Sequence, residues 1–143
     1  MAEMKIRELS IGDWVMNLYA NKPSRVIGLR TMFQDTYEII AVSDDTQYML
    51  IEDNKELHNF EPIPLTPEIL EKNGFVKKNY DNGKMWDWWC DNVLVRKFAD
   101  EDIYRFIVVF NSKHYTTMMV VGKHTHQLQH ALRLAGVGKE IEI

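Results

Sequence analysis

The sequence has little cysteine and no long apolar run. Its single cysteine, Cys90, excludes an intramolecular disulfide, which is typical of proteins from reducing compartments. The apolar segments are too short to cross a bilayer, and the first residues lack the pattern of a secretion signal. We therefore expect a cytoplasmic protein that does not enter a membrane, in which Cys90 is a small buried side chain rather than a nucleophile.

The sequence is also poor in basic charge. Its 17 Lys and Arg residues against 21 Asp and Glu give a net charge of −4, which weighs against general binding to nucleic-acid phosphates. It lacks a phosphate-binding glycine loop, a dinucleotide fingerprint and a nucleophile elbow. We therefore predict no cofactor. The 143 residues, 45% of them hydrophobic, are enough for one domain or two very small ones.

Residues 1–62 contain short β-rich segments separated by turn sequences. The turns are Gly12-Asp13, Asn21-Lys22-Pro23-Ser24, Ser43-Asp44-Asp45-Thr46 and Asp53-Asn54. Strands of about five residues at this spacing are typical of small barrels or curled sheets. We therefore predict a small barrel-like (SH3-like) β unit over residues 1–62.

A strong helix start follows the extended Pro62–Leu65 connector. Thr66 can cap a helix, and Pro67 fits its first position. Asn73-Gly74 provides the stop after about two turns. We therefore predict a short helix at the start of a second unit, residues 63–143.

The rest of that unit is predicted to be a β meander closed by a helix. Five β-rich segments follow the first helix, with Asp81-Asn82-Gly83 and Asn111-Ser112-Lys113 as turns. A helix is predicted over residues 125–135, and the tail Lys139–Ile143 is expected to add an edge strand. The fold class is thus α+β, with an antiparallel meander flanked by two short helices.

Two histidines in the last predicted helix are candidate metal ligands. His126 and His130 stand four residues apart, the spacing that places two imidazoles on one helix face in zinc proteases. The position of the catalytic base is occupied by Gln127, whose amide cannot exchange a proton near neutral pH. The apolar face consists of Leu128, Ala131, Leu132 and Ala135, so we expect both histidines to face solvent. A zinc site would need a third ligand, for which His114, Glu140 and Glu142 are candidates.

Three tryptophans stand within four residues, at Trp86, Trp88 and Trp89. In a strand, Trp86 and Trp88 share one face and Trp89 lies on the other. The simpler interpretation is that they pack in the core, because aromatic residues dominate core energetics. The functional alternative is a ligand-binding surface formed by Trp86, Trp88 or Trp89, since so many tryptophans exceed what a small core needs.

Three segments resemble a known group of sequences. They are residues 5–15 (KIRELSIGDWV), residues 62–75 (PIPLTPEILEKNGF) and residues 126–132 (HQLQHAL) together with the Lys139-Glu140-Ile141 ending. Together they resemble a family of small uncharacterised proteins of gut Bacteroidetes and their phages or mobile elements. The resemblance implies no activity, cofactor or catalytic residue.

We therefore predict a non-catalytic binding or adaptor protein that recognises a protein partner or a small ligand, with a homodimer also considered. One alternative is a metal-dependent hydrolase that uses His126 and His130. The other is a nucleic-acid-binding β-barrel that uses Lys22, Arg25 and Arg30 near two aromatic side chains. Those aromatic side chains are Trp14 and Tyr19.

Overall fold

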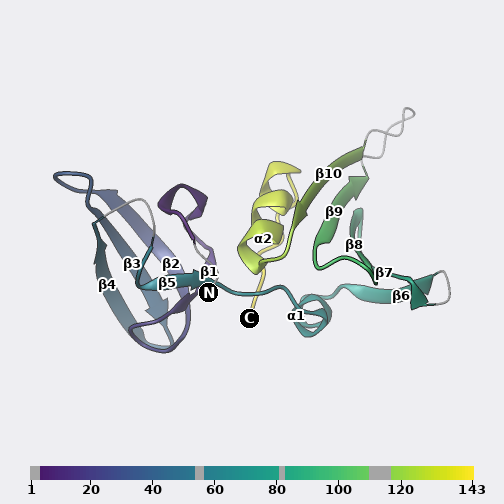
Figure 1. Cartoon of the computed structure of the whole chain (residues 1–143), viewed down its shortest axis with the longest axis horizontal. Helices are drawn as coiled ribbons and strands as arrows, with labels where there is room; N and C mark the ends of the chain where they lie inside the picture. The colour runs from purple at the N-terminus through teal and green to yellow at the C-terminus, as the bar shows by residue number, and fades with distance from the viewer. Residues whose placement is uncertain (1–3, 54–56, 81–82, 110–116) are drawn as a thin grey trace. The chain divides into compact units, whose positions relative to one another are not determined.

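The computed structural model describes residues 4–53, 57–80, 83–109 and 117–143, and it is an α+β fold (Figure 1). The chain divides into two compact units, the N-terminal unit Met1–Ile63 and the C-terminal unit Pro64–Ile143. Each unit contains one five-stranded antiparallel sheet and its own hydrophobic cluster. In the described residues, no helix is long and apolar enough to span a membrane.

The N-terminal unit is a curled sheet with the strand order β4-β3-β2-β1-β5. Its strands are β1 (Trp14–Asn17), β2 (Lys22–Thr31), β3 (Tyr37–Ser43), β4 (Thr46–Glu52) and β5 (Phe60–Pro62), and a 3₁₀ turn, η1 (Ile6–Glu8), precedes them. The long strand β2 shifts register between Val26 and Gly28. A Cβ at Gly28 would lie 3.1 Å from Ile40 Cδ1, so a side chain there would crowd strand β3. The shift bends β2, as bulges do.

Polar side chains inside the N-terminal unit bind loop backbone. The carboxylate of Glu52 is 1% exposed and accepts hydrogen bonds from the N–H groups of His58 and Asn59, at 3.0 and 2.8 Å. Two of the predicted turns contain residues with positive φ, Asn21 at 54° and Asp44 at 53°. Asn and Asp tolerate this conformation better than other non-glycine residues, which explains the turn signals in the sequence.

The C-terminal unit begins with helix α1 (Pro67–Lys72) and ends with helix α2 (Thr125–Leu134). Its strands are β6 (Val76–Tyr80), β7 (Met85–Cys90), β8 (Val93–Phe98), β9 (Tyr104–Val109) and β10 (Thr117–Gly122), paired in the order β10-β9-β8-β7-β6. The hydroxyl of Thr66 accepts a hydrogen bond from the N–H of Ile69 at 3.3 Å, so the predicted cap is confirmed. The meander is confirmed too, while the predicted turn residues 81–82 and 111–113 lie outside the described residues.

The core of the C-terminal unit lies between the two helices and one face of the meander, which we call the first face. Leu70 of α1 and Leu128 and Leu132 of α2 are fully buried in this cluster. Strand residues of the first face complete it: Trp88, Val93, Val95, Tyr104, Phe106 and Val108. Cys90 packs against the same cluster but is only partly buried, less than the sequence led us to expect.

The C-terminal segment is not an edge strand, so that prediction was wrong. Ile141 is buried, and its N–H donates to Gln129 Oε1 at 2.7 Å, while Gln129 Nε2 donates to the carbonyl of Lys139 at 3.0 Å. Asn73 likewise accepts from the N–H of Glu142 and donates to its carbonyl, at 2.8 and 2.7 Å. These two amides take the place of a neighbouring strand, because each offers both a donor and an acceptor.

Candidate functional site

The opposite side of the meander, which we call the second face, carries an apolar row across all five strands. The strand register places Val76 beside Trp89, Trp89 beside Leu94, Leu94 beside Ile107 and Ile107 beside Met119. These five residues are the apolar row. At its two ends, Val76 is 62% exposed and Met119 is 61% exposed, whereas Leu94 at its centre is buried. Both helices of the unit contribute to the cluster on the first face and not to this row.

A second row, of charged residues, runs beside the apolar row. The register places Asp87 beside Arg96 and Arg96 beside Arg105. Asp87 is 1% exposed, and Arg96 donates to both of its carboxylate oxygens, from Nε at 2.8 Å and from Nη2 at 2.9 Å. Such two-point contacts fix both side chains in one geometry, so this arginine is held in place on the second face.

Arg105 is fixed by different contacts. Its Nη2 donates to Glu101 at 2.9 Å, and its guanidinium carbon lies 4.6 Å from the centroid of the Phe98 ring. The second face therefore combines tryptophan, methionine and oriented arginines, the residue types enriched in protein interfaces.

The three tryptophans are not brought together on one recognition surface. Trp88 is buried in the core beside Tyr104, with ring centroids 6.2 Å apart, and Trp86 packs partly buried against the same cluster. The prediction that these two share a face is confirmed, but Trp88 is too deeply buried to meet a ligand from solvent. Trp89, on the other face, is the member of the predicted set that belongs to the apolar row.

Tyr104, a buried residue of this core, has an altered ionisation. Burial raises the pKa of Tyr104 above its ordinary value of 10.0, and the negative charge of Glu68 raises that pKa further. The side chain belongs to the hydrophobic cluster and packs beside Trp88, so we assign Tyr104 a role in the core.

The expectation that both candidate metal ligands face solvent was wrong for His126, which is 3% exposed. The buried side of helix α2 is wider than its stripe of Leu and Ala residues. Thr125 and Gln129 are buried as well. The ring of His126 stacks on that of His124 at 5.8 Å between centroids and meets the edge of His130 at 5.5 Å. These contacts make His126 part of the packing of the helix.

The metal hypothesis gains no support from the described part of the chain, where no group of three His, Cys, Asp or Glu residues could hold a metal ion. Glu140, a proposed third ligand, lies 3.4 Å from the guanidinium of Arg133, and Glu142 is exposed at the C-terminal segment. His114, the other proposed ligand, lies outside the described residues.

Gln127 has a structural role at the start of helix α2. Its Oε1 accepts hydrogen bonds from the N–H groups of Lys123 and His124, at 2.9 and 3.0 Å, and so satisfies backbone donors that the helix leaves unpaired. The side chain also lies against Gly122, where an added Cβ would be 2.7 Å from Gln127 Oε1. A glutamine at this position is thus explained by helix capping.

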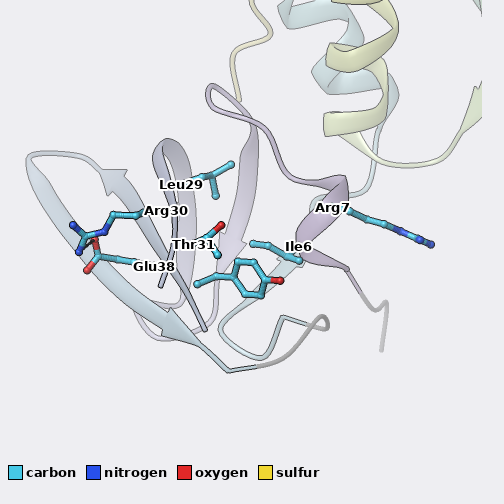
Figure 2. A pocket seen from close by; sticks show the side chains of 7 residues that line it. Ile6, Arg7, Leu29, Arg30, Thr31 and Glu38 are labelled. Atoms are coloured by element: carbon cyan, nitrogen blue, oxygen red, sulfur yellow. Dashed lines mark ion pairs between the residues drawn. The ribbon is translucent and has the colours of Figure 1, made fainter. Parts of the chain in front are cut away.

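The N-terminal unit contains a cavity of about 330 Å³ between η1 and the β2–β3 pair (Figure 2). Its lining residues are Ile6, Arg7, Leu29, Arg30, Thr31, Tyr37 and Glu38. In Figure 2, Arg7 points away from the other labelled side chains, whereas Arg30 lies against Glu38 with Nη2 3.1 Å from its carboxylate. The cavity is at the small end of the range for ligand sites and presents no unbalanced charge from this pair.

The cations proposed to bind nucleic acid are largely neutralised. Lys22 pairs with Asp44 at 3.1 Å, and Arg30 pairs with Glu38. Tyr19, one of the proposed stacking residues, packs edge-on against Tyr48 with ring centroids 6.1 Å apart. The geometry of the N-terminal unit therefore does not favour a phosphate-binding surface.

Comparisons of the chain with protein-family models, with curated proteins and with solved structures found no match. The candidate site therefore rests on the geometry of the second face. Sequence reasoning missed the apolar row because its members come from five strands, and only the register shows that they are neighbours. The signal that could have indicated it is the alternation of side chains between the two faces of each strand, which places one apolar residue per strand on the second face.

Proposed function

We propose that the protein is a non-catalytic binding or adaptor protein and that its partner is a protein with an apolar surface, bound over the second face. The observation that carries this proposal is the apolar row, whose ends at Val76 and Met119 are both more than 60% exposed. Contiguous apolar surface bordered by polar residues is typical of protein-binding sites. The oriented arginines Arg96 and Arg105 supply such a border.

The N-terminal unit is proposed to be SH3-like, with a role in binding rather than catalysis. Its support is the strand order β4-β3-β2-β1-β5 and the bend in β2. The resemblance to proteins of Bacteroidetes phages and mobile elements leads us to propose that the gene belongs to such an element.

Affinity capture with matched variants tests the proposed binding face. Val76→Lys places a charge at one end of the apolar row, whereas Met49→Lys changes a residue of similar exposure, 58%, on the sheet of the N-terminal unit. We expect partner proteins captured by the wild-type protein to be lost with Val76→Lys and retained with Met49→Lys. Purified partner should also change the fluorescence of Trp89. Equal capture by both variants would contradict a binding role for the second face.

A further inference from the structure

Edge strand β10 differs from the other three sheet edges in its charge. Edge strands usually carry charges or proline that prevent pairing with other chains. Strand β6 carries Lys77 and Lys78, and strand β5 has three residues ending in Pro62. Strand β10, with the sequence TMMVVG, has neither charge nor proline. Within the described residues its neighbour in the sheet is β9, on one side.

Strand β4 also exposes apolar side chains, but acidic residues border it. Asp44 and Asp45 precede it, and Glu52 and Asp53 lie at its other end. Antiparallel pairing of β4 with a second copy would bring these like charges together, which is unfavourable. Strand β10 has one charged neighbour in sequence, Lys123, at one end.

We propose that β10 pairs antiparallel with β10 of a second copy of this chain, which joins the two meanders into one sheet about a two-fold axis. The strand is self-complementary, as such an interface requires, because pairing it with itself opposes apolar residues and no like charges. The side chains exposed on its second face, Met119 and Val121, are 61% and 50% exposed in the single chain. The pairing brings Met119 of one copy beside Val121 of the other on the same face of the joined sheet.

The register of this pairing follows from the neighbours of β10. With Val120 on the axis, Met119 of one copy lies opposite Val121 of the other, and the paired segment runs from Met118 to Gly122. It stops before Lys123, whose N–H already donates to Gln127 at 2.9 Å and whose carbonyl accepts from the N–H of Leu65 at 2.9 Å. A shift of the axis to Val121 would pair Met119 with Lys123, whose backbone groups are already hydrogen-bonded, so we assign the axis to Val120.

This inference shares Met119 with the proposed function. It predicts pairing of two copies along the strand edge, which self-association measures, whereas the proposed function predicts partner binding over the second face, which affinity capture measures. In the double variant Met119→Lys/Val121→Lys, the lysine at position 119 of each copy faces the lysine at position 121 of the other, so two like-charged pairs form across the axis. We expect its dimer dissociation constant, measured by analytical ultracentrifugation, to rise about tenfold or more, since lost apolar pairs and like charges each cost a sizeable fraction of a kcal/mol.

The control variants separate edge pairing from face binding. Val76→Lys changes the other end of the apolar row, at equal exposure, and Met49→Lys changes the exposed edge strand of the other unit. Both should leave the dimer intact. Circular dichroism and thermal melting establish that each variant is folded.

Charge complementation tests the pairing and its register. Met119→Glu/Val121→Glu should be monomeric alone and should form a heterodimer when mixed with Met119→Lys/Val121→Lys. Met119→Lys/Val121→Glu opposes lysine to glutamate in the assigned register and should restore the homodimer. A monomeric wild-type protein, dissociation by Val76→Lys or Met49→Lys, or failure of the mixed variants to associate would each overturn the proposal.

Discussion

The two units use different buried side chains to bind backbone outside their sheets. In the N-terminal unit the carboxylate of Glu52 accepts two consecutive N–H groups, those of His58 and Asn59. In the C-terminal unit the amides of Asn73 and Gln129 both donate to and accept from the extended C-terminal segment. A carboxylate only accepts, so it matches a loop that presents adjacent donors, whereas an amide matches extended backbone. The type of buried polar residue therefore depends on the conformation of the backbone it binds.

The units also close their cores differently. The C-terminal unit covers the first face of its meander with α1 and α2, whereas the cluster of the N-terminal unit is formed by strands together with residues around η1. Because the members of each cluster come from one unit, damage to one core should be confined to that unit.

The largest expected effect comes from truncating the helix that covers the meander. Leu132→Ala should lower the free energy of unfolding of the C-terminal unit by about 2–5 kcal/mol, because it removes buried methyl groups and leaves a cavity. Chemical denaturation followed by NMR measures this, with the Trp14 indole reporting on one unit and Trp88 on the other. Leu134→Ala, in the same helix but 74% exposed, should cost less than about 0.5 kcal/mol. Loss of both units together would show that their stabilities are coupled.

The next effect should come from converting an amide into a carboxylate. Asn73→Asp removes the donor that serves the carbonyls of Ile69 and Glu142, both at 2.7 Å, and places negative charge against them. We expect a loss of about 2–3 kcal/mol in urea denaturation, from the cost of unsatisfied buried groups. The control is Asn92→Asp, where the amide also donates to a carbonyl but is exposed. An equal loss of unfolding free energy in Asn73→Asp and Asn92→Asp would show that burial of the Asn73 amide does not increase its contribution to stability.

The reverse exchange tests the N-terminal unit. Glu52→Gln keeps the size of the side chain but turns one of its two acceptors into a donor, which then faces a backbone N–H group. We expect a loss of about 1–3 kcal/mol, confined to the N-terminal unit and measured through Trp14. If Glu52→Gln is neutral or stabilising, the loop at His58 does not depend on a carboxylate, and the contrast between the two units fails.

The smallest effect concerns pH. The pKa of Tyr104 is raised in the folded protein by burial and by Glu68, so the folded state holds this proton more tightly than the unfolded state. Its contribution to stability is therefore complete below pH 10 and declines as the pH rises above that value. Tyrosinate absorbance should show one late-ionising tyrosine, which is missing in Tyr104→Phe. The stability of Tyr104→Phe should also fall less than that of the wild type as the pH rises above 10. If the tyrosinate titration of Tyr104→Phe is the same as that of the wild type, Tyr104 is not the late-ionising residue.

Much of the fold could be predicted from local sequence. The strands follow from alternation and turn residues, and helix α1 follows from Thr66 and Pro67, since these signals act over a few residues. The same alternation correctly separated Trp86 and Trp88 from Trp89. These features depend on backbone geometry, which a short segment determines by itself.

The features that could not be predicted depend on contacts far apart in sequence. The burial of His126 depends on how widely α2 is covered, which its apolar stripe does not show. Gln129 has a role because the C-terminal segment returns to it, and the apolar row exists because five strands align. Gln127 was interpreted as a missing catalytic base, since a zinc-protease motif and a helix cap place similar residues at the same spacing.

The close approach of Gly122 and Gln127 links two positions in a way that matters for sequence variation. A side chain at Gly122 would displace the carboxamide of Gln127 from the N–H groups of Lys123 and His124. Once that carboxamide has been displaced or removed, a further change at either position costs less than it would in the wild type. The two sites are therefore epistatic, and a library of paired substitutions should show tolerance at Gly122 that single substitutions hide.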